Sequence, residues 1–300
     1  MTALPHDELW PRAGAWPAPE GHVDAVLVGV PAWRTSLSPT GAHETPAAVR
    51  AALRRFSPAL PGTLPGTPPV DLNTVLRIGD AGDISDPDGR EGEGRVRDAV
   101  RELSATADLV IALGGDNSAT YAVAQGSDAA GMITLDAHLD LRDGESNGSP
   151  VRRLVADGLD PRRIVQIGIA DFANSAAYLQ RATDLGITMI TLDEVRQLGA
   201  RETMRRAWDV AGAGGGSGKV HLDIDVDVCD RSVAPGCPAS VPGGLAAWEL
   251  RALVREAASD PRLVSADIVE VDATADAADG RTVRLAALCV LELLTGKARR

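Results

Sequence analysis

Four short apolar runs, each followed directly by a polar cluster, constrain the fold of this chain more than any other feature. They span residues 109–113, 132–135, 220–222 and 268–269. Three more apolar runs lie at residues 25–30, 164–169 and 188–191. Runs of this length and composition are typical of buried strands.

Segments of helical composition alternate with these runs. They span residues 47–56, 95–107, 175–183, 193–210 and 245–258. Alternating strands and helices predict an α/β fold of three layers, with helices on both faces of a mostly parallel sheet. No change of composition marks a domain boundary, so we expect a single domain over residues 1–300, with an irregular leader at residues 1–20.

The remaining segments are rich in proline, glycine or acidic residues. We expect an irregular stretch, a strand, an acidic loop and a flexible linker at residues 57–71, 75–78, 79–94 and 212–219. The linker is a poor match to a phosphate-binding loop, because Val220 follows Lys219 where such a loop requires Ser or Thr.

The overall charge limits the partners of the chain. A formal net charge of −12 argues against nucleic acid and anionic membranes and leaves a small-molecule substrate. No apolar run reaches the roughly 18 residues of a membrane span, and the N-terminus lacks the pattern of a signal peptide. Because the chain has only three cysteines, we expect a cytoplasmic protein without a disulfide framework.

Two acidic clusters with a spacing of two residues follow two of the expected strands. They are Asp136, His138 and Asp140, and Asp223, Asp225 and Asp227. In extended backbone such side chains share a face, and the carboxyl ends of parallel strands meet at one edge of a sheet. Converging carboxylates repel one another unless they are protonated or bridged by cations. A single acidic turn is better explained as a helix cap or solvated loop, but two such clusters predict two divalent cations.

The small number of histidines indicates which metal ions the predicted site would bind. The chain has five histidines, so most ligands must be carboxylates. Carboxylates favour Mn²⁺ over Zn²⁺. We therefore expect two Mn²⁺ ions per chain.

Four motifs resemble the signatures of the ureohydrolase (arginase-like) family, in the family's order. They are residues 114–118, 136–140, 225–230 with 234–238, and 268–270. Residues 41–46, with Arg50, also resemble the family's entry segment, so the resemblance covers about residues 25–295. It implies an arginase-like fold, a binuclear metal centre and hydrolysis of a C–N bond in an amidine-like group. We also expect a homo-oligomer.

The resemblance implies roles for individual residues. Asp136 and Asp225 match the carboxylates that bridge both metal ions. His138 and Asp227 match further ligands of one ion, and Asp140 matches a ligand of the other.

Three further positions bear on the site. Asn117 stands where arginases and agmatinases have a histidine ligand, and its amide oxygen is a weaker ligand for most transition metals. Asp223 stands where a small hydroxyl residue is usual, so it could support a ligand or compete with one. Glu270 matches the family's acidic residue near the reacting group, and we expect it to carry a proton to the departing amine.

The loop after Asp140 discriminates within the family. Arginases and agmatinases carry a His-Gly pair there, whereas this loop reads Asn147-Gly-Ser-Pro and has no histidine. Formimidoylglutamases also lack that histidine, and residues 165–175 and 234–238 resemble the bacterial enzymes. The resemblance implies hydrolysis of N-formimidoyl-L-glutamate to L-glutamate and formamide in histidine degradation.

A substrate with two carboxylates calls for cationic or backbone donors. We expect these from Arg142, Asn147, Gly148 and Ser149, with Arg152 and Arg153 as weaker candidates. The same loop also carries Asp143 and Glu145, which could instead meet a cationic substrate. A guanidino hydrolase such as agmatinase therefore stays an alternative, as does a non-catalytic binding protein on this fold.

Overall fold

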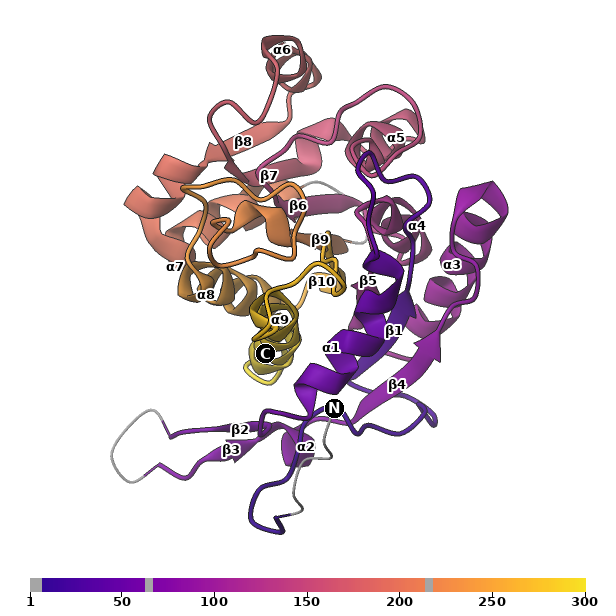
Figure 1. Cartoon of the computed structure of the whole chain (residues 1–300), viewed down its shortest axis with the longest axis vertical. Coiled ribbons are helices and arrows are strands. Elements are labelled where there is room, and N and C mark those ends of the chain that lie inside the picture. Colours follow the sequence, from indigo (N-terminus) through magenta and orange to yellow (C-terminus); the bar gives the residue numbers. More distant parts are fainter. Residues whose placement is uncertain (1–6, 63–66, 214–217) are drawn as a thin grey trace.

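The order of the strands places the motif-bearing strands side by side. The computed structural model describes residues 7–62, 67–213 and 218–300 (Figure 1). In this part of the chain, eight strands form one sheet in the order β4–β1–β5–β10–β9–β6–β7–β8, with all neighbours parallel. Their bounds are β1 (Ala25–Val30), β4 (Ile78–Asp83), β5 (Val110–Gly114), β6 (Gly131–Leu135), β7 (Ile164–Ile169), β8 (Thr188–Thr191), β9 (Val220–Asp225) and β10 (Leu263–Val269).

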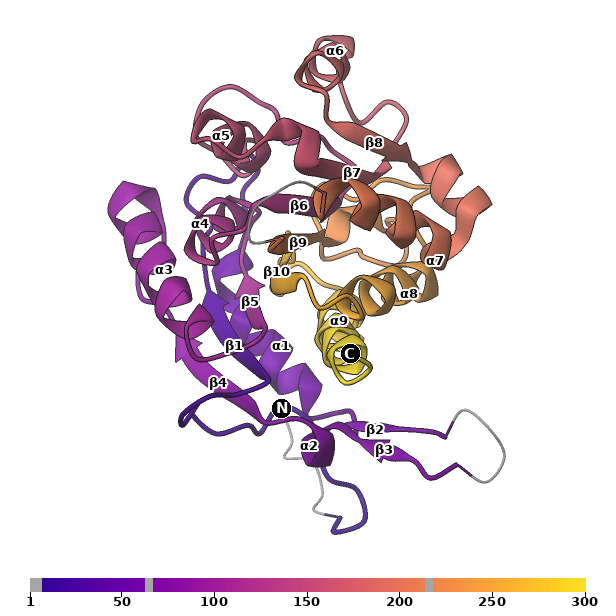
Figure 2. The same ribbon diagram turned by 180° about the vertical axis from the view of Figure 1, so that it is seen from behind.

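Helices cover both faces of this sheet, as Figures 1 and 2 show. One layer consists of α1 (Thr45–Leu53), α7 (Leu192–Ala211), α8 (Ala247–Ala258) and α9 (Arg281–Lys297). The other contains α3 (Gly89–Ser104), α4 (Ser118–Gly126), α5 (Pro150–Ala156) and α6 (Ala176–Leu185). The expected three-layer α/β fold with a mostly parallel sheet is confirmed.

Local sequence explains where the helices begin and end. Helix α7 begins with a capping box, in which the Thr191 hydroxyl accepts from the Glu194 backbone N–H and the Glu194 carboxylate accepts from the Thr191 N–H at 2.8 Å. Helix α6 ends at Gly186, whose φ of 77° lies in the left-handed region that glycine adopts without strain.

The expectations for residues 75–94 were wrong at most positions, and only residues 84–88 form the expected loop. Val75, which was expected to begin a strand, is the last residue of the short helix α2 (Leu72–Val75). Strand β4 starts at Ile78 and includes the first residues of the expected acidic loop. The last residues of that expected loop belong to helix α3. Polar residues are tolerated in β4 because it is an edge strand, and Asp80 and Asp83 both pair with Arg50.

Other segments also differ from expectation. Residues 57–71 contain an antiparallel pair, β2 (Ala59–Leu60) and β3 (Val70–Asp71), while residues 63–66 lie outside the described part. Residues 7–20 form neither helix nor strand, as expected of a leader, and residues 1–6 and the linker residues 214–217 lie outside the described residues.

Besides α2, the helices α4, α5 and α9 lie outside the ranges expected to be helical. Helices α4 and α9 are buried along most of their length, so their apolar residues are not confined to one face. None of the described helices is long and apolar enough to cross a membrane.

The sheet order brings the four polar clusters together. The clusters follow β5, β6, β9 and β10 in the sequence, but β10 and β9 lie between β5 and β6 in the sheet. All four strands are parallel, so their carboxyl ends open onto one edge near the middle of the sheet.

Candidate metal centre

Five of the expected ligands converge at the carboxyl ends of β6 and β9. Ligand atoms of Asp136, His138 and Asp227 lie within 4.8 Å of one another, and so do those of Asp136, Asp140 and Asp225. Asp136 belongs to both groups, which is the arrangement that a bridging ligand requires. The four carboxylate residues are buried, and His138 is partly exposed.

A turn, and not an extended strand, aims the first cluster. Strand β6 ends at Leu135, so the expectation of extended backbone through Asp140 was wrong. The His138 backbone N–H donates to Asp136 Oδ1 at 2.6 Å, and Asp140 has a φ of 52°. A non-glycine residue in the left-handed region is strained, and such strain concentrates at functional sites.

The second cluster is also only partly extended. Asp225 is the last residue of β9, whereas Asp227 lies in the 3₁₀ helix η3 (Val226–Val228). The Asp227 backbone N–H donates to Asp225 Oδ1 at 2.8 Å. Asp227 Oδ1 accepts from the Ala137 N–H at 3.1 Å, which ties the two clusters together.

The electrostatics of this centre are those of an acidic site that needs cations. Burial first, and neighbouring carboxylates second, raise the pKa of Asp136 to about 7 and hold the pKa of Asp140 and Asp225 well above the ordinary range. Asp136 Oδ2 is buried without a hydrogen-bond partner in the described part of the chain. The four carboxylates carry four negative charges when ionised, which two divalent cations would balance. The donor set therefore fits a pair of hard divalent cations.

His138 forms two ion pairs within this cluster, a longer one with Asp136 at 3.6 Å and a shorter one with Asp227. His138 Nδ1 lies 2.6 Å from Asp227 Oδ2. Burial opposes the charged imidazole, but the charges of Asp227 and Asp136 and their hydrogen bonds to the ring together outweigh it and raise the pKa of His138 to about 12. Since only a neutral imidazole binds a metal ion, His138 must lose this proton when it becomes a ligand.

Asn117 borders the same carboxylates, but it presents its amide nitrogen to them. Asn117 Nδ2 donates to Asp140 Oδ2 at 2.5 Å and to Asp225 Oδ2 at 3.2 Å. Its Oδ1 accepts from the Thr120 hydroxyl at 2.6 Å. A role for the amide oxygen as ligand thus requires the amide to turn over, with the Thr120 hydroxyl then accepting from the nitrogen.

Glu270 stands beside the carboxylate cluster at the end of β10. Its Oε1 accepts from the Asn117 backbone N–H at 2.8 Å and from Asn147 Nδ2 at 2.7 Å. Its φ of 60° is again left-handed. Burial, with the nearby Asp116 carboxylate adding to it, raises the pKa of Glu270 to about 8, so this group can hold a proton at neutral pH. The next acid, Asp272, is held elsewhere, because it accepts from the Gly41 N–H at 2.8 Å.

A cavity of about 370 Å³ lies above the carboxylates. Asp140, Asp225, Asp227 and Glu270 form its acidic part, and its walls come from residues 36–38, 139–142, 147–148, 173–175, 178 and 238–239. Asn174, Ser175 and Tyr178 line one wall and were not expected from the sequence, because only the fold brings this segment to the site.

Arg142 is the only guanidinium among the described residues that line this cavity. Its two acidic neighbours in the loop face elsewhere. Asp143 pairs with Arg181 at 2.9 Å, and Glu145 pairs with Arg90 at 2.7 Å. Neither acid lines the cavity.

Of the other expected substrate-binding residues, two line the cavity and one does not. Asn147 and Gly148 line the cavity, and the Leu37 N–H donates to Asn147 Oδ1 at 3.0 Å. Ser149 is fully buried, and its hydroxyl donates to the Ser146 carbonyl at 2.8 Å, so it shapes the loop from within. The weaker candidates Arg152 and Arg153 lie outside the cavity lining.

Asp223 lies within β9, two residues before the end of the strand at Asp225. It pairs in register with Asp267 of β10 and with Thr134 of β6, and it belongs to neither group of ligand atoms. Its carboxylate oxygens are buried without a hydrogen-bond partner among the described residues. Burial, and then the charge of Asp267, hold the pKa of Asp223 well above its ordinary range.

Comparison with known proteins agrees with this geometry. The Arginase family model matches residues 23–296. Formimidoylglutamase from Bacillus subtilis (strain 168) is 35% identical over 281 residues, covering 90% of this chain and 86% of the relative.

Solved structures extend the likeness to three dimensions. The crystal structure of formimidoylglutamase from Bacillus subtilis superimposes with a TM-score of 0.88 at 30% identity, covering 99% of this chain and 95% of that one. Trypanosoma cruzi formiminoglutamase with Mn²⁺ gives a TM-score of 0.83 at 26% identity, covering 97% and 99% of the two chains. The family model spans nearly the whole chain, and the fold is the arginase-like one that the motifs implied; this chain belongs to the arginase family.

Proposed function

We propose that this protein hydrolyses N-formimidoyl-L-glutamate to L-glutamate and formamide. The observation that carries the choice of substrate is the charge of the cavity. Its acidic groups are gathered at the metal centre, and Arg142 is the only guanidinium among the described lining residues. A substrate with two carboxylates suits such a mouth, whereas agmatine would bring an ammonium group toward Arg142. The similarity to formimidoylglutamases supports the same substrate.

We assign two Mn²⁺ ions to the centre. Asp136 and Asp225 would contact both ions, His138 and Asp227 would complete the site of one, and Asp140 with Asn117 the site of the other. The two groups of ligand atoms share Asp136, which supports its role as a bridge, and the excess of buried carboxylate supports two cations. Asp225 belongs to one of the two groups, together with Asp140, so its role as the second bridge rests on the resemblance. The manganese-containing structure of the Trypanosoma cruzi enzyme supports the choice of metal.

The residues of the chain divide the chemistry between them. When bound, the cations act as a Lewis acid and make water nucleophilic at neutral pH. Water adds to the formimidoyl carbon, and the bond from that carbon to the glutamate nitrogen breaks. The departing nitrogen needs a proton, and Glu270 is the acid at the cavity whose pKa suits that task.

Two side chains hold the reacting groups in place. Asn147 donates to Glu270 and so fixes the direction of its carboxyl group. Arg142 is exposed at the mouth of the cavity, and no hydrogen bond of its guanidinium lies within the described residues. It is therefore available for a bidentate contact with a substrate carboxylate.

We extend the proposal to the setting of the enzyme. Formimidoylglutamate is a product of histidine breakdown, so we place the reaction in histidine degradation, and the composition favours the cytoplasm. We also propose a homo-oligomer, for which light scattering after size exclusion is the direct measurement. Exposed apolar side chains such as Trp248, which is 70% exposed, are available for such contacts.

One assay tests the substrate assignment. The Mn²⁺-loaded protein is incubated in parallel with N-formimidoyl-L-glutamate, agmatine, L-arginine and guanidinobutyrate, and formamide, urea and amine products are quantified. We expect formamide from the first substrate at a rate far above that of any guanidine. Faster release of urea from a guanidine would replace the substrate but keep the metal hydrolase. Metal-loaded protein that releases neither product would favour a non-catalytic binding protein.

A further inference from the structure

The turn that carries the first three metal ligands needs backbone partners from outside the sheet. Strand β6 ends before this turn, and just beyond the strand the Asp136 N–H still donates to the Ile167 carbonyl of β7 at 3.0 Å. Ala137 and Leu139, on either side of His138, are both buried. Since buried backbone N–H and C=O groups are almost always paired, other groups must hold this part of the chain.

Asn174, in the loop after β7, holds the turn on both sides of His138. Its Oδ1 accepts from the Leu139 N–H at 3.0 Å, and its Nδ2 donates to the Ala137 carbonyl at 3.0 Å. The Ala170 N–H donates to the same carbonyl at 3.2 Å. One carboxamide therefore spans the residue that presents the imidazole and fixes the peptide groups before and after it.

A second carboxamide, Gln166, holds the turn from within the sheet. Its Nε2 donates to the Leu139 carbonyl at 2.8 Å. Gln166 is a residue of β7, is fully buried and does not line the catalytic cavity. Together the two carboxamides fix both backbone groups of Leu139, which separates His138 from Asp140.

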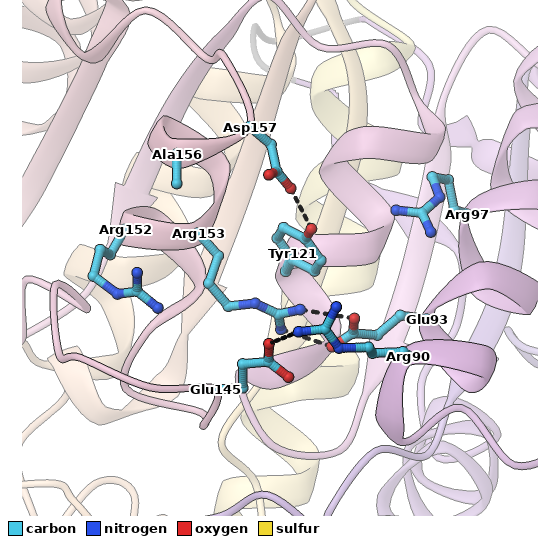
Figure 3. A pocket seen from close by; sticks show the side chains of 9 residues that line it. All are labelled: Arg90, Glu93, Arg97, Tyr121, Glu145, Arg152, Arg153, Ala156 and Asp157. Carbon is cyan, nitrogen blue, oxygen red and sulfur yellow. Dashed lines mark hydrogen bonds and ion pairs between the residues drawn. The ribbon is translucent and has the colours of Figure 1, made fainter.

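The chain just after the turn is held differently, by arginines. Arg181 donates to the Leu141 carbonyl at 2.7 Å, and Arg152 donates to the Arg142 carbonyl at 2.7 Å. Arg152 lines a separate pocket, which Figure 3 shows. A guanidinium in contact with the metal-binding turn would repel the cations, whereas a carboxamide is neutral and offers both a donor and an acceptor. The two uncharged side chains are therefore suited to hold the ligands themselves.

We propose that the two carboxamides, Asn174 and Gln166, are positioning residues for the metal ligands on this turn. Asp140 has a φ of 52°, and a residue keeps this left-handed conformation only where the surrounding contacts determine it. The bonds to Leu139, immediately before it, are such contacts. Groups that orient metal ligands contribute about 10–100-fold to metal affinity. This inference rests on the proposed metal centre but not on the choice of substrate.

Metal binding tests the proposal directly. Chelator-treated protein is titrated with Mn²⁺ against a fluorescent chelator, for the unchanged protein and for the variants Asn174→Ala and Gln166→Met. Methionine keeps the length of the glutamine side chain and removes its donor. The unchanged protein should bind two ions, and each variant should bind at least one of them about tenfold or more weakly.

Asn73→Ala is the matched control for the loss of a carboxamide. Asn73 lies on α2, at the far end of the molecule from α6, and its Oδ1 accepts from the Trp16 indole N–H at 2.9 Å (Figure 1). This variant should bind Mn²⁺ as the unchanged protein does.

Two further measurements separate positioning from other roles. A merely structural role would lower the melting temperature of metal-free and metal-loaded protein alike, whereas positioning reduces the rise in melting temperature that a fixed Mn²⁺ concentration produces. Asn174 also lines the cavity, so a substrate contact would raise KM at unchanged Mn²⁺ affinity. Positioning instead lowers kcat at limiting Mn²⁺, leaves KM unchanged and lets excess Mn²⁺ restore much of the rate.

Two kinds of result would overturn the proposal, and they can be told apart. Unchanged Mn²⁺ affinity in either variant, with or without a change in KM or melting temperature, would refute the positioning role of that residue alone. Failure of the unchanged protein to bind two Mn²⁺ ions would overturn the metal centre and this proposal with it.

Discussion

In protein from which divalent cations have been removed, the free energy of unfolding should decrease progressively as the pH rises from about 5 to about 8. Burial, with the charge of Asp116, raises the pKa of Glu270 to about 8, and burial beside Asp227 raises the pKa of Asp136 to about 7. In the unfolded chain both groups ionise near pH ~4. A group whose pKa is raised by folding contributes stability below its unfolded pKa and loses it as the pH rises toward the folded value.

The size of the effect follows from the protons that the native state retains. One retained proton lowers the free energy of unfolding by about 1.4 kcal/mol per pH unit. Glu270 alone therefore removes about 3 kcal/mol between about pH 5 and pH 7, out of the roughly 5–15 kcal/mol that keeps a domain folded. His138, with its pKa raised to about 12, acts in the same direction above its ordinary range. Bound cations cancel most of this dependence, because the ligands are then ionised in the native state as well.

Urea unfolding of the EDTA-dialysed protein, followed by tryptophan fluorescence at several pH values, measures this slope. The buried Trp208 makes fluorescence sensitive to loss of the core. The variant Glu270→Gln is the internal control, since it removes one titrating group and should make the slope shallower by about 1.4 kcal/mol per pH unit. Excess Mn²⁺ should flatten the slope. Metal-free protein that is equally stable at both ends of the range, or more stable at the higher pH, would refute the reasoning.

Four further outcomes follow from the site. Glu270→Gln should keep its metal but lose about 10²–10⁴ in kcat; near-normal turnover would move the proton transfer elsewhere. Arg142→Ala should raise KM for formimidoylglutamate about tenfold or more at unchanged metal content, and an unchanged KM would remove Arg142 from substrate binding. Asn117→His should strengthen metal binding in a chelator titration, and unchanged affinity would count against Asn117 as a ligand. Metal affinity should increase with pH because His138 must release a proton, which calorimetry in buffers of different ionisation enthalpy can count.

The elements that the sequence predicts best are strands formed by apolar runs. The bounds of β1, β7 and β8 coincide with the apolar runs at residues 25–30, 164–169 and 188–191. Prediction fails where tertiary packing overrides the pattern. Strand β4 tolerates acidic residues because it is an edge strand paired with Arg50, and α9 has no polar face because α1 and α8 cover it.

The composition of the site was predictable from the sequence, but its geometry was not. The motifs point to Asp136, His138 and Asp140 without stating that the chain turns after Leu135. The structure brings these side chains together, but through a turn and not through the extended backbone that was expected. The sign of the charge at the cavity mouth could not be predicted from the sequence either, because Asp143 and Glu145 follow closely after Arg142. Only their ion pairs with Arg181 and Arg90, from distant segments, remove them from the cavity.

The contrast between Asp223 and Asp227 shows why spacing alone could not define the ligands. Both stand two residues from Asp225, and continued extended backbone would place all three on one face. The strand ends at Asp225, so Asp227 enters a 3₁₀ turn that carries it to His138, while Asp223 stays inside the sheet against Asp267. Asp223 lies two residues before the end of the strand, is fully buried, and belongs to neither group of ligand atoms. The point at which β9 ends therefore decides which of two equally spaced aspartates faces the metal centre.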